Sequence, residues 1–340
     1  MADIIRERVR LDFRWPTQDP FLVCVHHVDR YPAGNEALGP RASLAGRDLG
    51  QDFARKDGWN MYHGETVPGF PAHPHRGFET VTIVEQGYVD PADSLGAVAR
   101  YGMGDVQWLT TGSGVEHSEM FPLLNAAGPN PTELFQIWLN LPASSKHVPA
   151  DFAMFWRERI PRETVTDGRG AKTRVEVVAG RFDDVEALPA PAASWAADPA
   201  HDVAIWLLEL DPLASFTMPA AHAGTGRALY FYEGERARVG EQAVDAATGL
   251  FLRPDVAFDI DNGDAAARFL LLQGKPIGEP VVQHGPFVMN SAQEIRDTLV
   301  DYQRTGFGGW PWGRRDPVFD RTRGRFARHP DGRTEEAAAP

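Results

Sequence analysis

Two segments indicate both the fold and the chemistry of this chain: HPHRGFETVTIVEQGYV, residues 73–89, and GDVQWLTTGSGVEHSEM, residues 104–120. Short apolar and β-branched runs alternate with glycines in both stretches, a pattern typical of strands joined by turns. Each stretch also carries two metal-ligand residues two positions apart, His73 with His75 and His117 with Glu119. Because side chains at i and i+2 of a strand share a face, two such strands can direct both pairs to one point.

Three imidazoles and a carboxylate are ligands that suit a divalent transition metal, and a six-coordinate metal would keep positions for water or substrate. The identity of the carboxylate stays open at this point. Glu79 lies four residues after His75 and has the same parity as the histidine pair, so it competes with Glu119 for this role. Glu116 has the opposite parity to His117 and is expected to face away from the site.

The rest of the chain favours an all-β fold. Its 33 glycines and 27 prolines supply many turns. Gln136 lies on one of the predicted strands, where it can contact either a substrate or a metal-bound water. Short apolar or alternating runs bounded by turn residues predict further strands at 19–28, 133–141, 173–182, 202–212, 227–235, 249–255 and 267–274.

Two segments read as helices. Residues 290–303 begin with a capping box, Ser291 and Glu294, and place Ile295, Leu299 and Tyr302 on one face that we expect to pack against the protein. Residues 152–161, FAMFWRERIP, are predicted to form a second helix near an inter-domain connection. The Ala- and Pro-rich residues 187–200 predict a surface loop, and the Arg-rich tail is expected to be poorly ordered beyond about residue 325.

Bulk properties exclude several classes of function. The formal net charge of −13 argues against direct nucleic-acid binding, which requires an excess of Lys and Arg. Cys24 is the single cysteine, so no intrachain disulfide can form, which suits a reducing compartment. The first 15 residues have no apolar signal-peptide core, and the chain has no apolar run of 18 residues. We therefore expect a cytoplasmic protein with no membrane partner.

The segments HPHRGFETVT, GDVQWLTTGSGVEHSEM and QHGPFVMNSAQEI together resemble the pirin family of the cupin superfamily. The resemblance implies a bicupin with a C-terminal helix: an N-terminal metal-binding barrel at 1–145, a C-terminal barrel at 146–289, and a helix and tail at 290–340. It implies one Fe²⁺ per chain, with other divalent transition metals as alternatives, held by His73, His75, His117 and Glu119. The family pattern thus selects Glu119 over Glu79. No H-x-H or H-x-E follows residue 150, so the second barrel is expected to be metal-free.

The resemblance also implies a function, a quercetin 2,3-dioxygenase type of ring opening. Its partners would be a small aromatic, flavonol-like substrate and O2, with Glu119 as general base for the substrate hydroxyl. The alternative is a non-enzymatic, metal-dependent regulatory protein that binds a protein partner. A metal-dependent isomerase or hydrolase is a third option, because one fold supports several chemistries.

Overall fold

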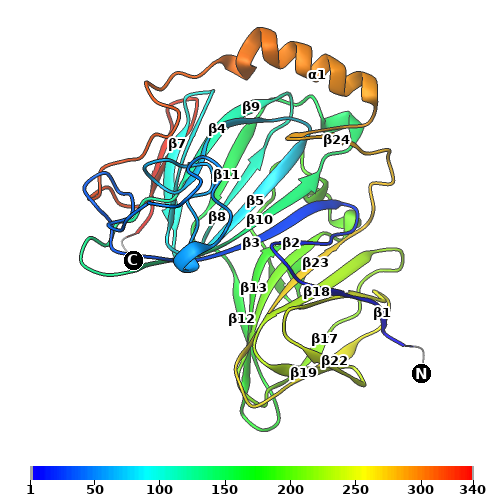
Figure 1. Ribbon diagram of the computed structural model, residues 1–340. Helices are drawn as coiled ribbons and strands as arrows, with labels where there is room; N and C mark the ends of the chain where they lie inside the picture. Colours follow the sequence, from blue (N-terminus) through cyan, green and yellow to red (C-terminus); the bar gives the residue numbers. More distant parts are fainter. Residues whose placement is uncertain (1–2, 339–340) are drawn as a thin grey trace. The chain divides into compact units, whose positions relative to one another are not determined.

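The computed structural model describes residues 3–338 and consists mainly of β-strands, with one α-helix, α1 (Ala292–Thr305), among those residues (Figure 1). The chain forms two compact units. The N-terminal barrel contains His26–Gln136, Leu141–Glu158 and the chain from Glu279 onward. The C-terminal barrel contains the chain up to Val25, Ile137–Asn140 and Arg159–Gly278. The predicted boundaries at residues 145 and 289 assume that each barrel is one continuous stretch of sequence. The compact units are not continuous: the chain up to Val25 belongs to the C-terminal barrel, and the chain from Glu279 onward belongs to the N-terminal barrel.

Two six-stranded sheets supply the strands of the N-terminal barrel, except that residues 14–15, 21–25 and 137–140 of the first sheet belong to the other compact unit. The first runs in the order β11 (Asp151–Phe155), β8 (Asp105–Thr110), β5 (Phe78–Gln86), β10 (Asn130–Asn140), β3 (Phe21–Tyr31) and β2 (Arg14–Trp15). The second runs in the order β27 (Thr334–Glu336), β26 (Phe326–Arg328), β7 (Val98–Gly102), β6 (Tyr88–Asp93), β9 (Val115–Met120) and β4 (Gly69–His75). A hairpin, β24 (Val282–His284) with β25 (Phe287–Met289), leads into α1.

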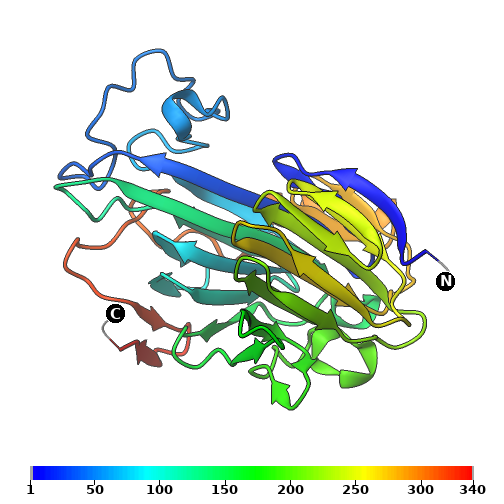
Figure 2. The same cartoon turned by 90° about the horizontal axis from the view of Figure 1, so that it is seen from below.

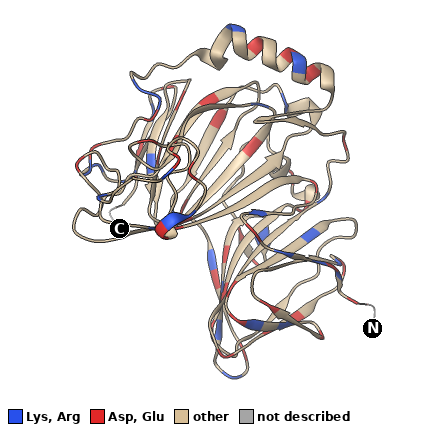
Figure 3. Ribbon diagram, in the orientation of Figure 1, with Lys and Arg blue, Asp and Glu red and all other residues tan. Residues whose placement is uncertain are grey.

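Helix α1 packs against the N-terminal barrel, as the sequence predicts. Ser291 caps the first turn by accepting a hydrogen bond from the Glu294 backbone N–H. The Glu294 side chain accepts from the Ser291 hydroxyl and from the Asn290 N–H, one residue before the N-cap, in a variant of the capping box. Ile295 is buried against Phe287 of the hairpin. Acidic and basic residues occur along the helix (Figure 3), and Ile295, Leu299 and Tyr302 form its apolar face.

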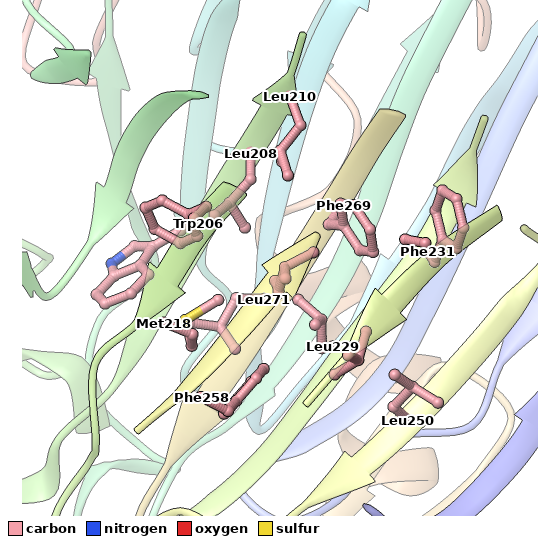
Figure 4. Close-up of a cluster of buried hydrophobic side chains, with 14 of the residues drawn as sticks. Trp206, Leu208, Leu210, Met218, Leu229, Phe231, Leu250, Phe258, Phe269 and Leu271 are labelled. Atoms are coloured by element: carbon pink, nitrogen blue, oxygen red, sulfur yellow. The ribbon is translucent and has the colours of Figure 1, made fainter. Parts of the chain in front are cut away.

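The C-terminal barrel has a seven-stranded and a four-stranded sheet around an apolar core (Figure 4). The first runs in the order β1 (Ile5–Arg10), β21 (Thr248–Leu252), β18 (Gly226–Glu233), β23 (Ala267–Gly274), β16 (Ala204–Leu210), β13 (Lys172–Ala179) and β12 (Arg162–Thr166). The second runs in the order β17 (Ser215–Met218), β22 (Phe258–Asn262), β19 (Arg236–Val239) and β20 (Gln242–Asp245). Figure 2 shows β1 beside β21, so the N-terminal segment completes a barrel made largely of later sequence.

The predicted helix at 152–161 is wrong, because residues 151–155 form strand β11, which pairs antiparallel with β8, and residues 156–161 form a turn. Phe152, Met154 and Trp156 are buried in the barrel core, and this spacing of two is that of a strand. Residues 181–182 and 185–186 form a two-stranded ladder, β14 (Arg181–Phe182) with β15 (Val185–Glu186). Short 3₁₀ turns occur at Lys56–Gly58, Ala143–Ser145, Trp195–Ala197, Pro199–His201 and Gly306–Gly308.

The prediction of a poorly ordered tail is also wrong. Strand β26 pairs with β7, and Arg325 just before it is buried with its guanidinium 2.6 Å from Asp105 and 2.5 Å from Glu158. The buried Arg100 donates to main-chain carbonyls of Phe319, Asp320 and Arg323. The tail therefore satisfies a buried cation of the barrel, which composition alone does not reveal.

The strands predicted at the nine apolar runs are present, with ends shifted by a few residues. No helix within residues 3–338 has both the length and the apolar character needed to cross a bilayer.

Candidate metal centre

Strands β4 and β9 pair antiparallel and bring the two ligand motifs together. His73 lies directly opposite His117, and His75 opposite Val115. An irregularity in β4 between Phe70 and His73 shifts the register, so that Phe70 rather than residue 71 lies opposite Glu119. The same-face argument from the sequence therefore holds for the histidines, because the ladder between 73–75 and 115–117 is regular.

The three histidines form one cluster. Their ligand nitrogens lie within 4.8 Å of one another, and no other group of three or more His, Cys, Asp or Glu residues among those described meets this criterion. The Nε2 atoms of His73 and His117 are 3.1 Å apart. The Nδ1 of His73 is 2.9 Å from the Pro71 carbonyl, so an Nδ1–H donor there would leave Nε2 with its lone pair toward His117. Such converging lone pairs are stabilised by a shared cation or proton.

Burial keeps the cluster in its ligand form. It lowers the pKa of His73 to about 4, and it lowers the pKa of His75 and His117 well below the usual range, with the neighbouring His73 adding to both shifts. All three imidazoles are therefore neutral at neutral pH. A metal can bind them without displacing protons from their nitrogens.

Glu119 lies next to this cluster, with its Oε2 atom 3.7 Å from Nε2 of His117. Gln136 of β10 donates from Nε2 to the same oxygen at 2.9 Å, and Thr82 of β5 donates to Oε1 at 3.4 Å. Thr82 also donates to the Gln136 side-chain oxygen. Burial raises the pKa of Glu119 to about 7, and the two hydrogen bonds oppose that rise. The opposite sheet thus holds the carboxylate beside the histidines.

Gln136, for which the sequence favours a substrate or water contact no more than a plain core-strand position, donates to Glu119 in the structure. Thr82 was not singled out from the sequence. A polar residue between Val81 and Ile83 on a fully buried strand is the signal that could have identified it.

The two competing glutamates lie elsewhere. Glu79 is fully buried on β5 and accepts a hydrogen bond of 2.7 Å from Thr110. Glu116 faces away from the cluster, as its parity predicts, and accepts hydrogen bonds from Tyr302 of α1 and from Arg315. The cluster of the described residues contains the three histidines and no glutamate, and Glu119 is the carboxylate found 3.7 Å from His117.

The neighbours of the candidate ligands contact the docked C-terminal segment. Arg76, next to His75, forms an ion pair with Asp301 of α1 at 2.5 Å and lies 4.4 Å above the ring of Phe307. Glu116, next to His117, reaches Tyr302. On β9 and at the end of β4, the residue next to a candidate ligand therefore contacts α1, while the ligand itself points into the cluster.

Three further histidines lie outside the cluster. His26 stacks on Phe135 at 4.4 Å, and its Nε2 is 3.0 Å from Glu133. His27 is buried, which lowers its pKa to about 3. His222 is exposed in the C-terminal barrel beside Asp202, and the expectation that this barrel lacks a metal stays a prediction.

Two cupin-type barrels, one of them with a buried three-histidine cluster, define the class of this protein as a bicupin. The family model described as Pirin matches residues 45–139, and the model described as Pirin C-terminal cupin domain matches residues 205–308. The chain belongs to the pirin family.

Relatives and solved structures agree with this assignment. A Pseudomonas aeruginosa protein named "Putative quercetin 2,3-dioxygenase" is 40% identical over 238 residues, which cover 70% of this chain and 79% of that protein. Pirin of Homo sapiens is 32% identical over 257 residues, covering 74% of this chain and 81% of that protein. The crystal structure of quercetin 2,3-dioxygenase from Acinetobacter baumannii matches with a TM-score of 0.70 at 25% identity, covering 90% of this chain and 98% of that one.

The donor set suits a divalent transition metal. Three neutral imidazoles and, beside them, one buried carboxylate provide nitrogen and oxygen donors. The converging His73 and His117 nitrogens are the observation that favours a cation over a purely structural cluster.

Proposed function

We propose that His73, His75, His117 and Glu119 hold one iron(II) ion and that the chain is a dioxygenase acting on flavonol-type substrates. The observation that carries the proposal is the convergence of three neutral histidine side chains beside a carboxylate fixed by two hydrogen bonds. Similarity to proteins named as quercetin 2,3-dioxygenases supports the substrate class. Iron(II) would supply Lewis acidity and a redox centre for O2 chemistry.

The chain's own residues would position and deprotonate the substrate. Gln136 donates to Oε2 of Glu119, which fixes the direction in which the carboxylate points. Burial raises the pKa of Glu119 to about 7, and a bound cation would lower it again, so the carboxylate would be ionised and could accept a proton. A flavonol hydroxyl beside Glu119 would pass its proton to this carboxylate, and the resulting enolate is the electron-rich form that reacts with O2.

The test is O2 uptake by the iron-loaded protein with quercetin. Glu119→Gln keeps the shape and one ligand oxygen and removes the basic site, so turnover should fall about 10²–10⁴-fold, the usual contribution of a general base. Glu116→Gln is the matched control, because it removes a carboxylate from the same strand on the opposite face. Its turnover should remain within about threefold of the parent. Equal losses in both variants would contradict the role of Glu119.

A regulatory function is the second candidate, and one observation favours it. Arg76 and Glu116, each adjacent to a candidate ligand, contact Asp301 and Tyr302 of α1. Metal binding would then change the contacts of α1, a helix with an exposed face to which a protein partner could bind. Absence of O2 consumption with every flavonol, together with metal-dependent hydrogen exchange in α1, would favour this reading over the enzyme.

A further inference from the structure

The C-terminal barrel contains a cavity of about 1010 Å³ at one end of its apolar core. Arg227 of β18, Gln273 of β23 and Ala204 of β16 share one cross-strand level, because Gln273 is registered with both of the others. The next level inward is Trp206, Leu271 and Leu229, which belong to the core. Figure 4 shows these three core side chains packed together. Arg227 thus lies on the interior face, at the boundary between the core and the cavity.

Arg227 is a buried cation with incomplete partners. It is 1% exposed, donates from Nε to the Gln273 side-chain oxygen at 2.9 Å, and donates from Nη1 to the Pro219 carbonyl at 2.7 Å. Within residues 3–338 no hydrogen bond from its Nη2 and no ion pair with a carboxylate is found, and Nη2 is not one of the fully enclosed unpaired atoms, so it lies at the cavity surface. A buried guanidinium normally has an anionic partner, because burying an isolated charge is costly.

The nearest acid does not replace that partner. Asp202 already accepts hydrogen bonds from the His222 backbone N–H and from the Thr225 hydroxyl. Burial lowers the pKa of Arg227 to about 10, and Asp202 opposes this shift only from a distance. The guanidinium therefore remains a cation at neutral pH. The remaining acidic side chains on the cavity wall, Asp183, Glu186 and Asp198, are exposed at its rim.

About half of the cavity wall around Arg227 is apolar. The Ala- and Pro-rich segment contributes Leu188, Pro189 and Ala196, and Ala221 faces them from the loop before β18. Trp206 lines the inner part of the cavity. A volume of about 1010 Å³, with apolar wall segments and the buried Arg227 and Gln273, is large enough for a small molecule that has an anionic and an apolar part.

We propose that this cavity binds a small organic carboxylate, whose anionic group pairs with Arg227 and whose apolar body lies against the Ala- and Pro-rich segment. The carboxylate completes the Nη2 hydrogen bond and neutralises the buried charge, since a guanidinium fork matches a carboxylate in geometry. The site is independent of the metal centre proposed for the other barrel, and it gives residues 187–200 a function as a cavity wall.

The test is isothermal titration of the full-length protein with benzoate, after metal removal so that no carboxylate can bind a metal. Benzoate should bind once per chain with a Kd of about 10 μM to 1 mM, and benzamide, which has the same shape without the charge, should bind at least about tenfold more weakly. Arg227→Gln should weaken benzoate binding by about tenfold or more. No saturable benzoate binding, equal binding of benzamide, or undiminished binding by a folded Arg227→Gln protein would overturn the proposal.

A second pair of variants tests the site without altering the buried arginine. Ala221→Trp places a large ring in the cavity from a half-buried loop position, and Ala223→Trp places the same ring on the exposed surface two residues away. Benzoate binding should be lost in the first variant and retained in the second. Retention in Ala221→Trp would show that benzoate binds elsewhere and would refute the assignment.

Discussion

Replacing Gln136 by Leu tests how the protein holds its candidate carboxylate ligand. The substitution keeps the side-chain volume and removes the amide that donates to Oε2 of Glu119 at 2.9 Å. Glu119 is 4% exposed, so water cannot readily replace this donor. The remaining hydrogen bond, from Thr82, is longer at 3.4 Å. Loss of the amide should therefore disfavour the ionised carboxylate, which is the form that binds a metal.

The magnitude follows from the type of bond. A hydrogen bond to a charged, buried acceptor contributes about 1.5–3 kcal/mol, which corresponds to roughly 10- to 150-fold in metal affinity. Groups that orient a metal ligand show effects of the same size, about 10- to 100-fold. Gln136→Leu should therefore weaken metal binding by at least about tenfold while leaving the circular dichroism spectrum unchanged.

The assay is competition for Zn²⁺ or Fe²⁺ against a chromophoric chelator, under anaerobic conditions for iron. Gln86→Leu is the matched control, because Gln86 also donates to a carboxylate, that of Glu133, at 3.2 Å, but in no contact with the histidine cluster. Its metal affinity should equal that of the parent. Affinities of the two variants within about twofold of each other would refute the role assigned to Gln136.

Three further predictions concern stability. Ile295→Ala should destabilise the N-terminal barrel by about 2–3 kcal/mol, because it leaves a cavity under α1. Val300→Ala, at a position 64% exposed on the same helix, should leave the melting temperature nearly unchanged. Equal melting curves of the two variants would contradict the packing of α1 against the barrel. Burial raises the pKa of Asp29 to about 6, so the folded state binds the Asp29 proton more tightly than the unfolded state does. Protonation of Asp29 therefore adds to the free energy of unfolding at low pH, and this contribution is lost as the pH rises through about 6. Unfolding titrations should therefore show the parent gaining about 1 kcal/mol relative to Asp29→Asn between pH 7 and pH 5, and a pH-independent difference would contradict this assignment. Deleting the chain after residue 318 removes the carbonyls that satisfy buried Arg100 and should clearly lower the melting temperature; an unchanged value would show that the tail is dispensable.

Local patterns predicted most of the fold because they act over a few residues. Strand alternation placed His73, His75 and His117 on one face, and the β4–β9 ladder has the regular register that this reasoning assumes. The capping box at Ser291 located the start of α1 to within two residues. Where backbone periodicity and capping chemistry are strong, tertiary context does not override them.

Long-range partners explain what the sequence did not reveal. The FAMFWRERIP segment has apolar residues at both even and odd positions, so the ladder with β8 rather than periodicity decides that it begins as a strand. Arg325 looked like part of a solvated basic tail, yet Asp105 and Glu158 lie 220 and 167 residues away in the chain and pair with it. The contact between Gln136 and Glu119 could not be predicted from the sequence either, because the two residues lie on strands of different sheets.

Metal content of the purified protein after anaerobic loading with Fe²⁺ tests the central claim most directly. The account predicts one iron per chain in the parent and in His222→Ala, a histidine substitution in the other barrel, and almost none in His75→Ala, with the fold retained in all three proteins. Full iron occupancy in His75→Ala, or two irons per parent chain, would contradict the four-ligand site.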